Sequence, residues 1–108
     1  MVVVSMTTAK LKPDISLVEV RKIWDESIYP AIKDQKGYLG GFLLVSEQKD
    51  EGVSVGLWES KEDSEAIQKS GLYQEQVKKF AAFIESMVGR KLYEVNSEIV
   101  FAKELEAI

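Results

Sequence analysis

Residues 38–59 read YLGGFLLVSEQKDEGVSVGLWE, and this stretch decides the fold. A polar segment separates two apolar runs, which are residues 38–47 and 53–59. Both runs have strand composition, and we expect Gly52 to supply the positive φ of a tight turn between them. The pattern predicts an antiparallel hairpin, and Gly40 and Gly41 predict a bulge or a close backbone approach inside it.

Upstream of the hairpin, the sequence predicts a strand and then a helix. Residues 2–9 are rich in β-branched side chains, which favour a strand. Ser16 and Glu19 have the spacing of a capping box, so we expect a helix from there to about residue 35. Pro30 lacks a backbone N–H and predicts a kink or an early stop near Tyr29.

Downstream of the hairpin, the sequence predicts a broken helix and a last strand. Ser60 and Asp63 resemble a second capping box, and Gly71 interrupts the helix that they begin. Apolar side chains then continue at helical spacing up to Gly89, where we expect the helix to stop. They are Tyr73, Val77, Phe80, Ile84 and Met87. Residues 91–101 are predicted to form the last strand.

The order of elements is therefore βαββαβ in one domain over residues 1–108. Right-handed crossovers make a ferredoxin-like antiparallel sheet the natural solution for this order, with both helices on one face and the first and third strands in the centre. Along the third strand, Val55 and Leu57 point to one face and Trp58 and its small neighbours to the other. The strand therefore carries apolar groups on both faces of the sheet. We expect a second copy of the chain to cover the face opposite to the helices, which predicts a homodimer.

Composition excludes several classes of function. The chain has 108 residues and a net charge of −4, without the basic face that nucleic-acid binding requires. It contains neither histidine nor cysteine, which excludes histidine bases, histidine metal sites and thiol chemistry. No apolar run is long enough for a membrane span. We therefore expect no metal, no cofactor, no nucleic acid and no membrane, and a cytoplasmic location.

Several segments together resemble the antibiotic biosynthesis monooxygenase superfamily. They are KGYLGGFLL at 36–44, VSVGLWES at 53–60, SGLY at 70–73 and the stretch 24–37. The resemblance implies a dimeric α+β barrel, with family activities that include cofactor-independent oxidation of polycyclic phenols and haem degradation. It also implies a Trp on the third strand, which Trp58 matches, and an Asn on the first strand, where Ser5 and Thr7 stand. Val77 falls near the haem-binding histidine of the degrading enzymes, so we expect no haem chemistry.

Four residues are candidates for a ligand pocket. Trp58 shares its face of the strand with Ser54, and small neighbours beside a large ring leave room for a planar aromatic ligand; the alternative is that Trp58 only packs under the helices. Tyr73 opens the second helical piece and can hydrogen-bond a ligand or assist proton transfer, or it is an ordinary residue of the apolar stripe. Asn96 can orient a polar group from the last strand, or it is a solvated edge residue.

The sequence leaves the function open and assigns no catalytic residue. The first hypothesis is a cofactor-independent monooxygenase acting on a small phenolic substrate, which needs an apolar pocket, a proton acceptor and hydrogen bonds to the substrate anion. The second is a non-catalytic dimer that binds a small ligand or a partner. An isomerase or decarboxylase on the same fold is a third.

Overall fold

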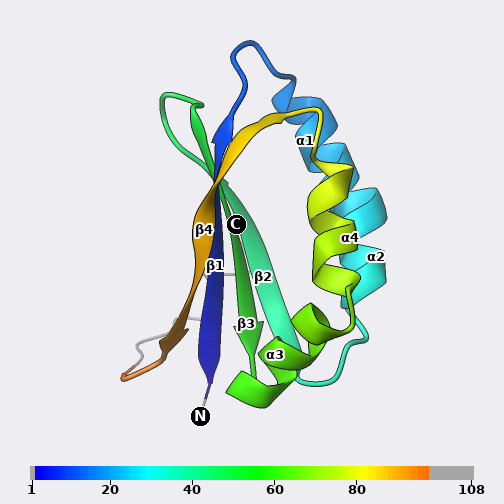
Figure 1. Ribbon diagram of the computed structural model, residues 1–108, viewed down its shortest axis with the longest axis vertical. Coiled ribbons are helices and arrows are strands. Elements are labelled where there is room, and N and C mark those ends of the chain that lie inside the picture. The colour runs from blue at the N-terminus through cyan, green and yellow to red at the C-terminus, as the bar shows by residue number, and fades with distance from the viewer. Residues whose placement is uncertain (1, 98–108) are drawn as a thin grey trace, which may run out of the picture.

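The computed structural model describes residues 2–97 as an antiparallel sheet with helices on one face (Figure 1). Its strands are β1 (Val3–Leu11), β2 (Tyr38–Val45), β3 (Glu51–Trp58) and β4 (Ile84–Glu94). Its helices are α1 (Leu17–Ile23), the π-helical turn η1 (Trp24–Ile28), α2 (Tyr29–Ile32), α3 (Lys61–Lys69) and α4 (Leu72–Lys79).

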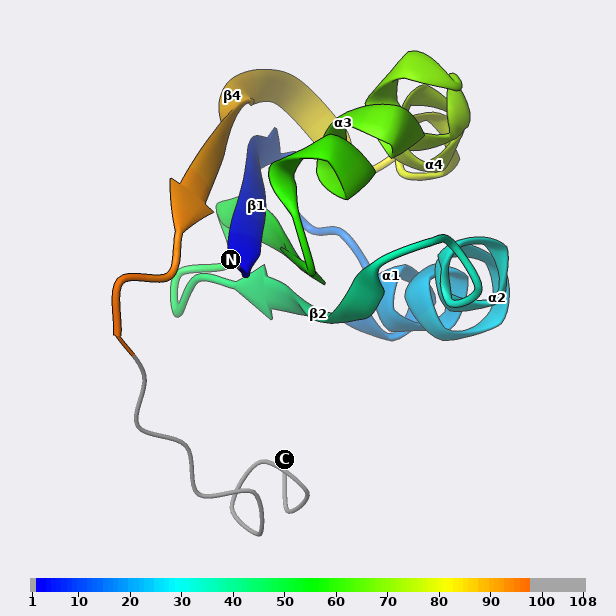
Figure 2. The ribbon, with the colours of Figure 1, turned by 90° about the horizontal axis from the view of Figure 1, so that it is seen from below.

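The order of strands in the sheet is β2-β3-β1-β4, with every neighbouring pair antiparallel. This is the ferredoxin-like arrangement that the sequence predicts, and β1 and β3 are its central strands. The sheet is open, with β2 and β4 at its edges. The two helical segments, α1–α2 and α3–α4, lie on the same side of the sheet (Figure 2).

Both predicted helix starts are confirmed by their hydrogen bonds. The Oγ of Ser16 accepts a hydrogen bond from the backbone N–H of Glu19 at 3.2 Å. The Oγ of Ser60 accepts one from the N–H of Asp63, also at 3.2 Å. Each cap satisfies an N–H that has no partner inside its helix, which fixes where the helix begins. Gly71, at φ 84°, separates α3 from α4 as expected.

The irregularity expected near Tyr29 takes the form of a π-helical turn. The N–H of Tyr29 donates to the carbonyl of Trp24, five residues earlier, and Pro30 follows at once in the first turn of α2. A wider turn before a proline lets the helix continue without the N–H that proline lacks. The helix then ends at Ile32, slightly before the predicted end.

The hairpin is confirmed, but its turn differs from the prediction. The positive φ belongs to Lys49, at 60°, whereas Gly52 lies in β3 with an ordinary strand conformation. Ser46 holds the turn, because its Oγ donates to a carboxylate oxygen of Asp50 at 2.8 Å. The predicted bulge is present at the start of β2, where the register shifts between Tyr38 and Gly40.

The largest error of the sequence prediction lies at the end of α4. The helix stops at Lys79, and the segment from Ile84 onward is strand, although its apolar spacing continues the helical pattern. The physical reason is β1, a central strand whose backbone N–H and C=O groups need partners on both sides. β4 supplies them on the side away from β3. Gly89, predicted to end a helix, pairs with Thr8 next to a bulge at Val88.

The last strand therefore begins and ends earlier than predicted. It stops at Glu94, after which the N–H of Val95 donates to the carbonyl of Val2 at 3.0 Å. Ile99 and Phe101, which the sequence analysis places on the same strand, lie outside the described residues.

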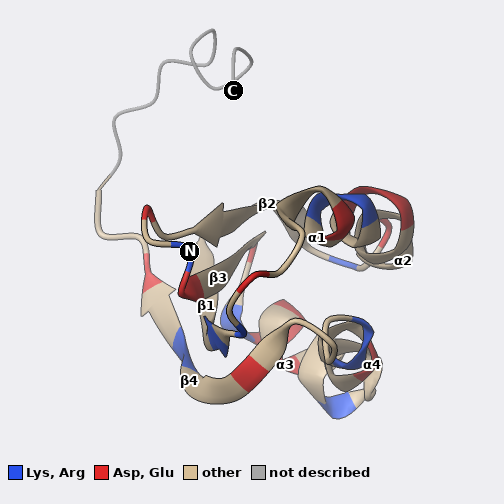
Figure 3. Ribbon diagram, turned by 90° about the horizontal axis from the view of Figure 1, so that it is seen from above, with Lys and Arg blue, Asp and Glu red and all other residues tan. Residues whose placement is uncertain are grey.

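The core lies between the sheet and the helices. Its buried cluster consists of Val3, Ile28, Ile32, Trp58 and Ile67. Acidic and basic residues are interspersed over the helices (Figure 3). None of the helices within residues 2–97 has the length and apolar character needed to cross a membrane.

Candidate functional site

A cavity of about 130 Å³ lies between the helix-covered face of the sheet and the helices. Its floor is formed by alternate residues of the two central strands, which face the helices because side chains alternate along a strand. Among these floor residues are Ser5, Thr7, Ser54 and Gly56. Residues of α4 and η1 contribute the other walls, and these walls are mainly apolar.

Trp58 belongs both to the cavity wall and to the core. Its side chain is 3% exposed and packs edge-on against Tyr38, with ring centroids 5.1 Å apart. The side chain of Trp58 thus packs in the core and also lines the cavity. Burial raises the pKa of the Tyr38 phenol above its ordinary value, and the neighbouring Tyr29 raises it further. Tyr38 therefore remains a neutral phenol beside the cavity at neutral pH.

Gly56 makes room for the indole of Trp58. A Cβ added at this position would lie 2.8 Å from the Oγ of Ser5 and 2.9 Å from the Nε1 of Trp58. Both distances are shorter than folded proteins tolerate, so only glycine allows the ring to lie over this part of the floor.

We expect Gly56→Ala to lower the free energy of unfolding by about 1–3 kcal/mol, because the methyl group overpacks the floor and displaces the indole. Urea denaturation measures the change. Gly52→Ala is the matched control on the same strand and face, since the nearest atom to a Cβ there is in the flexible Leu11 side chain, at 3.3 Å. Equal losses in the two variants would contradict the close approach at Gly56.

Tyr73 lies where α4 approaches the sheet. Its hydroxyl is 2.9 Å from the Oγ1 of Thr7, a hydrogen bond that joins the helix to β1 across the cavity. The guanidinium of Arg90, on β4, lies 5.6 Å from the centre of the Tyr73 ring. The cavity thus brings together a phenol, a threonine hydroxyl and a cation.

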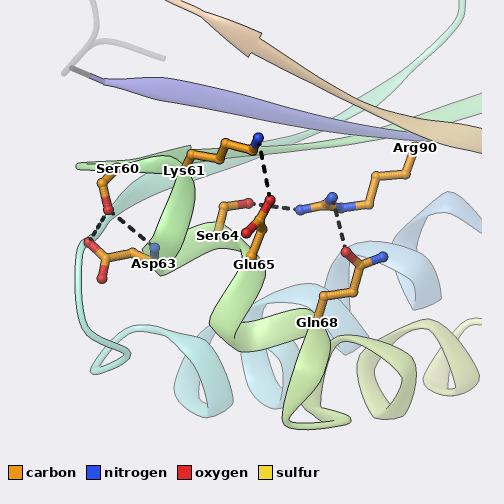
Figure 4. Close-up of polar contacts among 7 residues, drawn as sticks. All are labelled: Ser60, Lys61, Asp63, Ser64, Glu65, Gln68 and Arg90. Atoms are coloured by element: carbon orange, nitrogen blue, oxygen red, sulfur yellow. Dashed lines mark hydrogen bonds and ion pairs between the residues drawn. The ribbon is translucent and has the colours of Figure 1, made fainter.

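Two residues of α3 form hydrogen bonds with the Arg90 side chain (Figure 4). Its Nη2 lies 2.8 Å from the Oγ of the fully buried Ser64, and its Nη1 donates to the Oε1 of Gln68 at 3.3 Å. Among residues 2–97, no carboxylate forms an ion pair with it; the nearby pair joins Lys61 to Glu65. Because Ser64 and Gln68 are neutral, they do not offset the positive charge of the guanidinium, which remains available to a ligand.

The structure brings together three of the four candidate site residues. Trp58, Tyr73 and Ser54 line the cavity. Asn96 is exposed, lies beyond the end of β4 and does not line the cavity, because the last strand ends earlier than predicted.

Three residues that the sequence does not predict at the site also line the cavity: Arg90, Gln76 and Thr7. The last strand is predicted to begin only at residue 91, which leaves Arg90 outside it, whereas Arg90 lies in β4 and faces the cavity. Gln76 is a buried polar residue on α4, 8% exposed. Had the strand been predicted from Ile84, alternation along it would have placed Arg90 and Leu92 on the helix-facing side.

Chemically, the cavity suits a small, mostly apolar ligand with polar groups. No histidine exists in the chain, and none of the described residues that line the cavity is a carboxylate. No cluster of acidic side chains able to hold a metal ion is found within the part of the chain that the structure describes.

No family model and no curated protein matches the sequence. Several solved structures share its fold. Rv0793 from Mycobacterium tuberculosis is 17% identical, with a TM-score of 0.69 over 93% of this chain and 100% of that one. SnoaB, a cofactor-independent oxygenase from Streptomyces nogalater, is 11% identical, with a TM-score of 0.69 over 91% of this chain and 96% of its own.

A third structure contains a bound ligand. It is the monooxygenase from the ActVA-Orf6 gene of Streptomyces coelicolor in complex with Nanaomycin D, which is 12% identical, with a TM-score of 0.69 over 93% of this chain and 92% of that one. At such identities the likeness concerns the fold. The chain therefore has the α+β fold of the antibiotic biosynthesis monooxygenase superfamily, which its sequence resembles.

Proposed function

We propose that the chain is a cofactor-independent monooxygenase whose substrate is a small phenolic aromatic held in this cavity. The observation that carries the proposal is Arg90, a cation fixed by neutral partners beside the Tyr73 phenol in a mainly apolar cavity. A charge in such surroundings stabilises an anion more strongly than it would in water. The anion of an electron-rich phenol, such as a quinol, can reduce oxygen without a cofactor.

The residues of the cavity have separate roles in this chemistry. Arg90 lowers the pKa of a bound phenol, because an opposite charge favours the ionised form. The hydroxyl of Tyr73, which is paired with Thr7, is able to donate to the phenolate oxygen. In the overall reaction the substrate loses two hydrogens and gains one atom of O₂, while the other atom leaves as water with those hydrogens. All the electrons come from the substrate.

One observation favours the second candidate function, a non-catalytic protein that binds a small aromatic ligand. The chain has no histidine, and the described lining residues include no carboxylate, so the cavity offers no ordinary base for proton removal. Catalysis then depends on a substrate that reaches the cavity already ionised or ionises beside Arg90. Oxygen consumption separates the two candidates, because a binding protein consumes none.

We further propose that the chain acts as a homodimer through the sheet face that the helices leave uncovered (Figure 1). Exposed apolar side chains lie there on the edge strands β2 and β4, where Phe42, Leu44 and Tyr93 are 39%, 46% and 49% exposed. The register places Met6 and Val55 opposite one another in the centre of the same face. An apolar surface of this kind favours contact with another protein surface over contact with water.

We expect Arg90→Met to lower kcat/KM for oxygen uptake with quinol-like substrates by about 10- to 100-fold, because charge-assisted hydrogen bonds contribute roughly 1.5–3 kcal/mol. An oxygen electrode measures the rate as a function of pH. In the unmodified protein the rate rises as the substrate ionises. Without the cation, that rise moves to higher pH.

Arg21→Met is the matched control, since the Arg21 side chain is 85% exposed on α1 and forms an ion pair with Asp25. It should leave both the rate and the pH profile unchanged. An Arg90→Met protein with an unshifted profile and full activity would refute the role of Arg90. Ligand binding without any oxygen uptake by the unmodified protein would favour the non-catalytic candidate.

A further inference from the structure

Gln76 is a buried polar residue whose hydrogen bonds are incomplete. It lies on α4 and lines the cavity, and only 8% of its surface is exposed. Its Nε2 donates to the carbonyl of Leu72 at 3.2 Å. Its Oε1 is buried and accepts no hydrogen bond from the described residues. Buried acceptors are nearly always paired, so an unpaired one at a cavity wall is a position where a ligand can supply the missing donor.

The size of the cavity limits what that ligand can be. Its volume of about 130 Å³ is close to that of an engineered protein cavity, about 150 Å³, that binds one benzene molecule. A single aromatic ring therefore fits between the walls as they stand. Two or three fused rings exceed this volume.

The polar groups lie where substituents on one ring can reach them. Tyr73 and Gln76 are three residues apart on α4, which places them on the same face of the helix with Cβ atoms roughly 5–6 Å apart. Tyr73 in turn lies beside Arg90. Tyr73 and Arg90 thus stabilise a hydrogen-bond acceptor or an anion on the ligand. Gln76 can accept a hydrogen bond from a donor on the same ligand.

We infer that Gln76 determines ligand specificity by accepting a hydrogen bond from a hydroxyl or amine on a single-ring aromatic whose other polar group faces Tyr73 and Arg90. The inference rests on the proposed function, because it assigns the substrate to the same cavity. It goes further in naming a one-ring compound with two polar substituents, such as a quinol or an aminophenol.

The test compares two probes that differ in one donor, hydroquinone and 4-methoxyphenol, by calorimetry under argon so that binding is measured without oxidation. We expect the unmodified protein to prefer hydroquinone about tenfold, equivalent to about 1.4 kcal/mol. Gln76→Leu should reduce that preference to about twofold, the statistical advantage of a symmetric ligand with two equivalent orientations. Its melting temperature should stay the same or rise, because an unpaired buried acceptor is removed.

Gln74→Leu is the matched control, since it makes the same change at an exposed position of the same helix. It should keep the tenfold preference. Gln76→Met repeats the test with an unbranched side chain if the leucine variant does not fold. A preference that persists in both Gln76 variants, or that is absent from the unmodified protein, would overturn the inference and show that Gln76 has only a packing role.

Failure of the inference is distinguishable from failure of the proposed function. Selective binding of hydroquinone without oxygen uptake in air would sustain the role of Gln76 and remove the monooxygenase. Oxygen uptake with tricyclic substrates, together with no binding of either one-ring probe, would sustain the monooxygenase and overturn the inference.

Discussion

Trp58→Ala is expected to lower the free energy of unfolding by about 3–5 kcal/mol, a large share of the roughly 5–15 kcal/mol that stabilises a typical domain. The indole is 3% exposed, belongs to the central core cluster and packs edge-on against Tyr38. Its removal leaves a void next to the cavity, and Gly56 beneath it has no side chain with which to fill the space. Urea denaturation followed by circular dichroism measures the loss.

The same variant should also lose affinity for aromatic ligands, because the indole forms part of the cavity wall. The control must destabilise the core without touching the cavity. Trp24 is unsuitable, since it too lines the cavity. Val20 is 6% exposed on α1 and is not among the lining residues, so Val20→Ala should weaken folding while the folded fraction keeps its affinity. Equal effects of the two variants on binding would show that Trp58 is a core residue only.

Features governed by local interactions could be predicted from the sequence. A cap is decided by a side chain and a backbone N–H three residues away, so Ser16 and Ser60 mark the helix starts correctly. The hairpin follows from two strand-like runs joined by a short polar segment. The order of the sheet follows in turn, because few connections are compatible with βαββαβ.

The boundary between α4 and β4 could not be predicted by the same means. Ile84 and Met87 continue the helical spacing of Tyr73, Val77 and Phe80, and nothing local distinguishes the two states. Pairing with β1 makes the segment from Ile84 onward a strand, and β1 is distant from it in the sequence. Tertiary hydrogen bonding thus overrides a local pattern, as it commonly does for weak propensities.

This error accounts for the incorrect placement of Arg90 and Asn96. The last strand is predicted over residues 91–101, so Arg90 falls outside it and Asn96 within it, the reverse of what the structure shows. Trp58, Ser54 and Tyr73 lie before the error, and all three line the cavity. Gln76 has no signal in the sequence, because its burial depends on how α4 packs on the sheet.

Phe42→Lys is expected to convert the proposed dimer into a monomer. Phe42 lies on β2 and pairs with Val55, on the sheet face opposite to the helices. At 39% exposure it tolerates a lysine in the single chain, where the ammonium group reaches water. In a dimer through this face, two charges would be buried without partners, at a penalty of several kcal/mol each.

Size-exclusion chromatography with light scattering measures the outcome at micromolar concentration. The unmodified protein should have twice the 12.2 kDa mass of the chain, and Phe42→Lys should have the mass of one chain. Val18→Lys is the control, because Val18 is 78% exposed on α1, in the helical layer, and should leave the dimer intact. Because the uncovered face lies across the sheet from the cavity, a folded Phe42→Lys monomer should still bind aromatic ligands. An unmodified protein that is monomeric at these concentrations would refute the dimer and leave the apolar face to a different partner.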